Sequence, residues 1–237
     1  MPAKSFFIDC ISENSTRSFE RYAVVAVDVV RSATVAATII ASGRRCFFAP
    51  SIDAAIVLAT RLENPLLIGE IAGNMPYGFD FNNSPTEIEA CKDISRPAII
   101  VSSSGTPLFQ LLKRHNSAYV ACFRNYGSTA RHLISHYDHV AIIGAPTRGE
   151  FREEDQMCSA WIAADLVKSG FEPEDQRTIE IYNLWKDLPV KAWANGKSAE
   201  YLMNTGQTKD LEFLFGHVND LDFVLAIKGD EIVKVPF

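Results

Sequence analysis

The chain has 237 residues, of which 47% are hydrophobic and 22% are charged, and its formal net charge is −6. Its composition is that of an ordinary globular protein, and its length allows one large domain or two closely packed lobes with a boundary near residue 170. The acidic balance argues against broad binding to nucleic acid or to an anionic membrane, and no apolar run is long enough to cross a bilayer.

The cysteines and the N-terminus indicate the compartment. Five cysteines are scattered along the chain without a Cys-x-x-Cys pair, which is typical of reduced core residues and not of a disulfide framework or a zinc site. The apolar stretch near the N-terminus is too short for a signal peptide. We therefore expect a cytoplasmic protein. The sequence leaves the oligomeric state open, and a homo-oligomer is one of the alternatives.

Strand and helix patterns alternate along most of the chain. Short apolar runs, which suit strands buried on both faces, lie at 6–10, 23–27, 44–49, 66–70, 98–101, 118–123 and 139–144. Helical patterns lie at 32–42, 51–62, 106–115, 125–136 and 153–168, and residues 176–215 are mainly helical with breaks at Gly196 and Gly206. The alternation predicts an α/β fold with a largely parallel or mixed sheet and helices on both faces. Strands at 223–227 and 231–235 form a C-terminal pair, expected as an antiparallel edge or a small appendage.

The stretch from residue 66 to residue 89 combines a strand end, two acids and a helix start. Its apolar run ends on Glu70, and a glycine-punctuated loop then brings Asp80 between two phenylalanines. Ser84 is a typical N-cap, Pro85 fits the first helical position and Glu87 completes a capping box. Two carboxylates and free backbone N–H groups suit a divalent metal and an anion such as phosphate. A plain surface loop with a well-formed cap has the same pattern.

Polar residues follow five of the apolar runs. Because ligands bind beyond the carboxyl ends of the strands in open α/β sheets, we expect these residues to gather at one edge of one sheet. They are Asp28 and Arg31, Glu70, Ser102–Thr106, Arg124 with Asn125, and Arg148 with Glu150, Glu154 and Asp155. Carboxylates can hold Mg²⁺, and guanidinium forks and N–H groups can hold phosphate. The set therefore indicates a Mg²⁺-assisted reaction on a phosphate.

Each of these groups also has a purely structural interpretation. Asp28 could cap the following helix, and Arg31 could be a salt-bridge partner only. The turn at residues 102–106 could be a simple capped loop, and the arginines further along could be solvated. Glu154 and Asp155 lie in a first helical turn, where the helix dipole favours acids in any case, so only one of the two need be a ligand.

Other phosphate-handling motifs are incomplete. Residues 144–149 have the glycine spacing of a Walker A loop, but Glu150 and Phe151 stand where Lys and Ser or Thr are required. The histidines are not spaced as a metal pair, and we interpret those at 132, 136 and 139 as a helix face and its exit.

The order of the motifs resembles that of the 2-phosphosulfolactate phosphatase (ComB) family. The similar motifs are Asp28–Thr34, Gly69–Glu70, Gly78–Pro85, Ser102–Thr106 and Phe151–Asp155, within residues 23–168, and the stretch 222–236 is also similar. The resemblance implies an unusual α/β fold and a Mg²⁺-dependent phosphatase. It also implies a substrate, 2-phosphosulfolactate or a related 2-phospho acid, and a step of coenzyme M biosynthesis.

Residues and resemblance together lead to one main hypothesis. Asp28, Glu70, Asp80 and one of Glu154 or Asp155 hold Mg²⁺. Arg31 grips the transferring phosphoryl group, and Arg124 or Arg148 takes a second anionic group. Hydrogen bonds to the substrate come from Ser103, Ser104, Gly105, Thr106, Asn83, Ser84 and Asn125. Asp28 either forms a phospho-enzyme or orients an attacking water. The alternative is a non-catalytic sensor that binds a small anionic metabolite without a metal.

Overall fold

A single twisted sheet carries most of the strands, and the expected elements account for nearly all of them. The computed structural model describes residues 4–10 and 18–235. Residues 1–3 of the N-terminal stretch and Pro236 of the C-terminal similarity lie outside the described residues. The strands are β1 (Ser5–Cys10), β2 (Ala23–Val27), β3 (Cys46–Phe48), β4 (Leu66–Gly69), β5 (Ala98–Val101), β6 (Ala118–Ala121), β7 (His139–Gly144), β8 (Pro146–Thr147), β9 (Glu150–Phe151), β10 (Glu172–Pro173), β11 (Val224–Lys228) and β12 (Glu231–Val235).

Helices alternate with these strands, as the sequence pattern predicts. They are α1 (Ser32–Ala41), α2 (Ile52–Ala59), α3 (Pro85–Ala90), α4 (Gly105–Leu112), α5 (Tyr126–His136), α6 (Glu153–Lys168), α7 (Gln176–Trp185), α8 (Lys197–Asn204) and α9 (Thr208–Gly216), with a 3-10 turn at Val190–Trp193. Within the described residues, no helix is long and apolar enough to cross a membrane. All five cysteines are free thiols.

The sheet is made of two parallel groups joined by an antiparallel hairpin. Its strand order is β10-β1-β7-β2-β6-β11-β12-β3-β5-β4. The first five strands are parallel to one another, and so are the last three. The hairpin β11–β12 pairs antiparallel with β6 on one side and with β3 on the other. The α/β class with a mixed sheet is confirmed, but the C-terminal pair is neither an edge nor an appendage, because it lies in the middle of the sheet.

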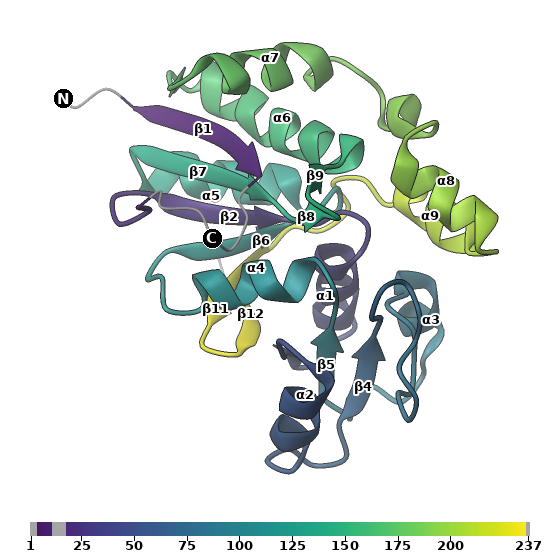
Figure 1. Cartoon of the computed structure of the whole chain (residues 1–237). Helices are drawn as coiled ribbons and strands as arrows, with labels where there is room; N and C mark the ends of the chain where they lie inside the picture. Colours follow the sequence, from purple (N-terminus) through teal and green to yellow (C-terminus); the bar gives the residue numbers. More distant parts are fainter. Residues whose placement is uncertain (1–3, 11–17, 236–237) are drawn as a thin grey trace.

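This topology changes how the strand ends meet. Three successive antiparallel pairings separate β6 from β3, so the two parallel groups run in opposite directions along the sheet. Twist accumulates at about 20–25° per neighbouring pair, or roughly 100–125° over the five steps from β2 to β5. As a result, the two groups are steeply inclined to each other, and the carboxyl ends of β4 and β5 point towards the group that contains β2 (Figure 1). The strand ends thus do not share the one common edge that the sequence pattern predicts.

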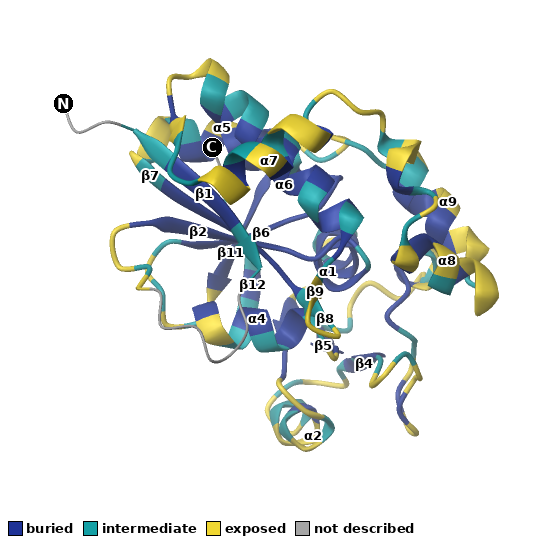
Figure 2. Ribbon diagram, turned by 45° about the horizontal axis from the view of Figure 1, so that its top comes forward, coloured by how far each residue is buried: buried dark blue, intermediate teal, exposed yellow. Residues whose placement is uncertain are grey.

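Helices cover both faces of the β1–β7–β2–β6 group. Helices α5, α6 and α7 pack together on one face, and α4 with α1 lies against the other (Figure 1). Strands β2 and β6 are buried along their whole length, which explains their continuous apolar sequence. Figure 2 shows this buried centre and, by contrast, the exposed outer surfaces of α2 and α8.

Candidate active site

A cavity of about 690 Å³ lies where the two groups of strand ends meet. It is lined by residues after β2, after β4 and after β5, by the β8–β9 hairpin, and by the first turns of α8. Its charged lining residues are Arg31, Arg148, Arg152, Lys197, Glu70 and Glu200. The size is in the range of small-molecule sites, and cations outnumber acids on its walls.

Asp28 follows β2 directly and is almost completely buried, with 2% of its surface exposed. Its Oδ2 atom has no hydrogen-bond partner. Burial raises the pKa of this carboxyl to about 6, the charge of Glu70 adds to the rise, and hydrogen bonds from Ser32 oppose it. A Cβ atom on Gly105 would lie 2.2 Å from this Oδ2, so glycine is needed where α4 approaches the acid. The site thus contains a buried acid with an unused oxygen.

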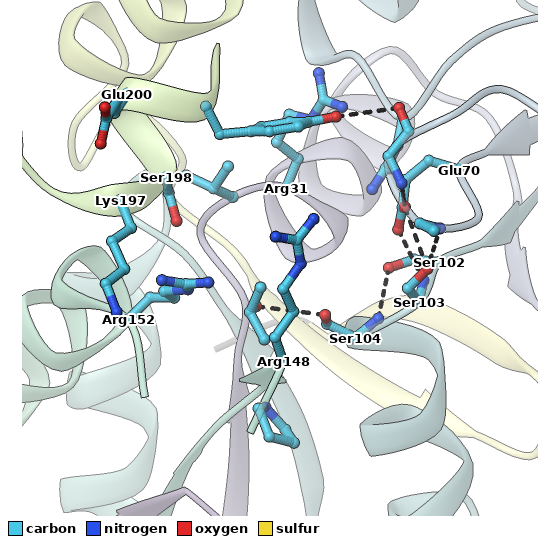
Figure 3. Close-up of a pocket in the computed structure, with 17 residues that line it drawn as sticks. Arg31, Glu70, Ser102, Ser103, Ser104, Arg148, Arg152, Lys197, Ser198 and Glu200 are labelled. Atoms are coloured by element: carbon cyan, nitrogen blue, oxygen red, sulfur yellow. Dashed lines mark hydrogen bonds between the residues drawn. The ribbon is translucent and has the colours of Figure 1, made fainter. Parts of the chain in front are cut away.

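The helix after β5, α4, begins two residues earlier than predicted. In the helical pattern at 106–115, the sequence Thr-Pro predicts Thr106 as the cap and Pro107 as the first helical residue. In the structure Ser104 takes the cap position, α4 starts at Gly105, and the Thr106 hydroxyl donates back to the Ser102 carbonyl at 2.7 Å. The Ser102 Oγ accepts from the N–H groups of Ser104 and Gly105. The turn thereby satisfies the N–H groups of Ser104 and Gly105 internally. It presents to the cavity the polar side chains of residues 102–104 (Figure 3).

Glu70 joins two of the loops that line the cavity. Its Oε1 accepts from the Ser103 N–H at 2.8 Å, and its Oε2 accepts from the Gly73 N–H at 2.7 Å and from the Ser103 hydroxyl at 3.2 Å. These bonds occupy both carboxylate oxygens. Glu70 is therefore placed to hold the turn after β5 against the loop after β4.

Glu154 and Asp155 open α6 and are both buried. Asp155 Oδ1 accepts from the Val29 N–H at 2.7 Å, which ties α6 to the segment after β2. Burial raises the pKa of Asp155 well above its usual value, and the charges of Glu154 and Asp28 raise it further. Burial likewise raises the pKa of Glu154 to about 7, with the hydroxyl of Ser198 opposing the rise. Like charges held this close are costly unless a proton or a cation offsets them.

The structure does not assemble the predicted metal ligands into one group. Asp80 is exposed, bonds to the Leu67 N–H and pairs with Arg96 at 3.2 Å, because its loop returns to the amino end of β4. Among the described residues, no three His, Cys, Asp or Glu side chains are placed to share a metal ion. Unpartnered oxygens remain on Asp28 and Glu154. Since Mg²⁺ commonly takes one or two carboxylates plus water and substrate phosphate, Asp28 fits such an ion, whereas a cage of four carboxylates does not fit.

Arg31 reaches the cavity but is held by a residue that sequence reasoning missed. Its guanidinium donates to Asp210 at 2.6 Å and also to Gln207. Asp210 in turn accepts from the hydroxyls of Ser84 and Thr86. The anion at the start of α3, predicted as a ligand, is thus the protein's own Asp210.

The predicted cap of α3 is confirmed, but the predicted capping box is not. Ser84 caps α3 by accepting from the Glu87 N–H. The Glu87 carboxylate accepts from the Asn82 N–H and so does not close the capping box.

The other predicted residues divide between the cavity and its surroundings. Arg148 lines the cavity, and its guanidinium extends towards the centre (Figure 3). Asn83 also lines it, with an Oδ1 atom that has no partner. Arg124 instead pairs with Asp220 at 2.7 Å, and Asn125 closes the turn after β6 through the Cys122 N–H and the Val120 carbonyl. Neither of these two lines the cavity. The same is true of Thr106, Ser84, Gly105 and Asp28, the last two of which lie directly behind the turn that does.

Sequence reasoning missed one wall of the cavity entirely. Arg152, Lys197, Ser198 and Tyr201 line it, and the Tyr201 hydroxyl donates to the Gly73 carbonyl at 3.1 Å across the opening. The sequence gave little indication of this wall, because residues 176–215 show only helical patterns. The one local feature that points to it is Gly196 followed by Lys and Ser at a helix start, where uncapped N–H groups and a cation come together.

Comparison with known proteins identifies the family. Residues 10–230 match the protein family described as 2-phosphosulpholactate phosphatase, and the chain belongs to that family. It is 26% identical to the 2-phosphosulfolactate phosphatase of Methanocaldococcus jannaschii over 90% of this chain and 92% of that protein.

Two further relatives show the same similarity. The chain is 27% identical to a probable 2-phosphosulfolactate phosphatase of Clostridium perfringens strain SM101, over 89% of this chain and 88% of that protein. It is 33% identical to one of Pseudothermotoga lettingae, where the match spans 62% of this chain and 63% of that protein. The predicted family membership is confirmed.

Proposed function

We propose that this chain is a Mg²⁺-dependent phosphatase that hydrolyses the phosphate ester of a small 2-hydroxy acid, with 2-phosphosulfolactate as the first candidate. The observation that carries the proposal is Asp28, a buried acid with an unpartnered oxygen beside a cavity lined by arginines, in a member of this family. Under this proposal the substrate is a small phosphorylated acid, and the protein acts in the cytoplasm, in a pathway such as coenzyme M biosynthesis.

The residues divide the work according to their positions. Mg²⁺, when bound by Asp28, would polarise the phosphoryl oxygens and offset the charge of the buried acids. Arg31, fixed by Asp210, grips the phosphoryl group where negative charge develops. The hydroxyl of Ser104 and the side chain of Asn83 orient that group, and Glu70 keeps the turn in place. Arg148 crosses the cavity and contacts the ester from the other side.

The test is phosphate release from 2-phosphosulfolactate with and without MgCl₂, using matched Asp28→Asn and Asp80→Asn variants. Both substitutions neutralise an acid that the sequence assigned to the metal, but Asp28 is buried against Gly105, next to the cavity-lining Ser104, whereas Asp80 is exposed at the amino end of β4. We expect Asp28→Asn to reduce kcat by ~10³-fold or more, since it removes the acid on which the reaction depends, and Asp80→Asn to retain nearly full activity. Equal activity of the two variants would overturn the assignment.

Two additional readouts refine the result. Hydrolysis in ¹⁸O-labelled water, combined with trapping of an acyl phosphate, distinguishes a phospho-enzyme on Asp28 from direct attack by water. Absence of turnover at any Mg²⁺ concentration, with binding of the ester retained, would favour the sensor over the phosphatase. The occupied oxygens of Glu70 are the observation that keeps the sensor as the second candidate.

A further inference from the structure

The wall formed by α8 and the β8–β9 hairpin carries cations that the phosphoryl group does not need. Arg152 and Lys197 line the cavity there. Figure 3 shows them on the opposite side from Ser102, Ser103 and Ser104, with Arg148 between the two sides. Because Asp28 lies against Gly105, which follows the turn that forms the other wall, a phosphoryl group held near Asp28 leaves this side of the cavity to another part of the ligand.

Glu150 binds both cations and fixes their positions. Lys197 Nζ donates to the two oxygens of Glu150 at 2.6 and 2.7 Å, and Arg152 donates to the same carboxylate at 2.8 Å. These contacts lower the pKa of Glu150, mainly through the hydrogen bond from Lys197. Two positive charges share one negative charge, so the three side chains together carry a net charge of +1.

Arg152 still has donor capacity in this arrangement. Its side chain is 9% exposed, and its buried Nε has no hydrogen-bond partner. A guanidinium has five N–H groups in a fixed fork that matches a carboxylate or a sulfonate. The neighbouring α8 begins after Gly196 without a side-chain cap, so the first N–H groups of this helix are also free of a capping side chain.

We infer that Arg152 and Lys197, positioned by Glu150, form a subsite for the second anionic group of the substrate, a carboxylate or sulfonate carried on the alcohol part of the ester. This inference rests on the proposed phosphatase function and adds to it the residues that select a doubly acidic ester. The net charge of +1 matches one such group. The sequence assigned this role to Arg124 or Arg148, and this inference gives it instead to the residues that open α6 and α8.

The kinetic test compares two phosphate esters of matched size. Phosphoglycolate carries a carboxylate and ethyl phosphate does not, so the ratio of their kcat/KM values reports the second subsite. We expect Lys197→Met to lower this ratio about tenfold, mainly through KM for phosphoglycolate. The control is Lys191→Met, which removes an exposed lysine of the neighbouring 3-10 turn that does not line the cavity and should leave the ratio unchanged. An unchanged ratio in Lys197→Met would overturn the subsite.

A binding measurement separates this inference from the proposed reaction. Sulfolactate carries a carboxylate and a sulfonate but no phosphate, and calorimetric titration of it needs no turnover. We expect wild type to bind it and Lys197→Met to bind it about tenfold more weakly, with Lys191→Met like wild type. If neither ester is hydrolysed but this pattern holds, the phosphatase proposal fails and the subsite stands. If both esters are hydrolysed and the three proteins bind sulfolactate alike, the subsite fails.

Discussion

Two arginine–aspartate pairs follow neighbouring parallel strands, and only one of them belongs to the cavity. Arg31 comes shortly after β2 and pairs with Asp210, and both side chains are 3% exposed. Arg124 comes shortly after β6 and pairs with Asp220, whose side chain is 32% exposed. In the sequence the two arginines looked alike, as candidate anion binders after apolar runs.

The difference comes from the strands on either side. Strand β2 lies between the parallel strands β7 and β6, so both of its neighbours run in its own direction and neither begins beside its carboxyl end. Strand β6 borders the antiparallel β11, and the segment leading into β11 therefore covers that end. The N–H groups of Asn219 and Leu221 donate to the carbonyls of Phe123 and Arg124. A strand end is open to a ligand only when no antiparallel neighbour begins beside it.

The largest expected effect concerns the aspartates of the two pairs. Asp210→Asn leaves Arg31 buried without its counter-charge, which should cost about 3 kcal/mol or more of unfolding free energy. Asp220→Asn breaks a partly exposed pair and should cost no more than about 1 kcal/mol. Urea unfolding of both variants measures the difference. Equal losses would mean that the two pairs are energetically equivalent despite their different burial.

The second expected effect is the part of the pH dependence that Asp28 contributes at the β2 end. The pKa of Asp28 is raised from 3.8 to about 6, so folding favours its protonated form. The stabilisation is complete below about pH 4 and is lost as the pH rises through 6, a change of about 3 kcal/mol. We expect metal-free wild type to lose this amount relative to Asp28→Asn between pH 4 and pH 7.

Denaturant unfolding in EDTA across this pH range tests that expectation. Subtracting the Asp28→Asn curve from the wild-type curve removes the contribution of distant carboxylates, some of which have a lowered pKa and act with the opposite sign, such as Asp93. The difference that remains belongs to Asp28 together with its effect on Asp155. The Asp220→Asn variant shows whether loss of any carboxylate produces the same profile. A flat difference between wild type and Asp28→Asn would show that the buried acid does not bind a proton on folding.

The third expected effect is kinetic and compares the arginines themselves. Arg31→Lys should lower kcat by ~10²-fold, or about 2.7 kcal/mol, because lysine cannot make two parallel hydrogen bonds to the phosphoryl group. Arg124→Lys should keep kcat and KM within about twofold and act only on stability, since Arg124 bonds Asp220 and Thr38 and not the cavity. Steady-state kinetics on 2-phosphosulfolactate measures both effects. A raised KM in Arg124→Lys would restore the anion-binding role that the sequence assigned to Arg124.

Local sequence patterns determined the elements and part of the site. The apolar run at Ala23–Val27 and the helix at Glu153–Lys168 were predicted with their observed bounds, because burial on both faces and helical periodicity are properties of neighbouring residues. The same holds for Ser84 as the cap of α3. Residues directly at the ends of β2, β4 and β5 also reached the cavity or its floor, because the end of a strand fixes the position of the next few residues.

Tertiary structure decided which of these residues meet. The insertion of β11 and β12 into the middle of the sheet turned the two parallel groups towards each other and covered Arg124. The return of the loop to the amino end of β4 took Asp80 away from Glu70. Packing of α8 and α9 brought Lys197 from late in the chain to the cavity and Asp210 to Arg31. These outcomes depend on contacts between segments that are far apart in the sequence. The free energy of such contacts depends on how the two surfaces fit together, which the local sequence pattern of either segment does not show.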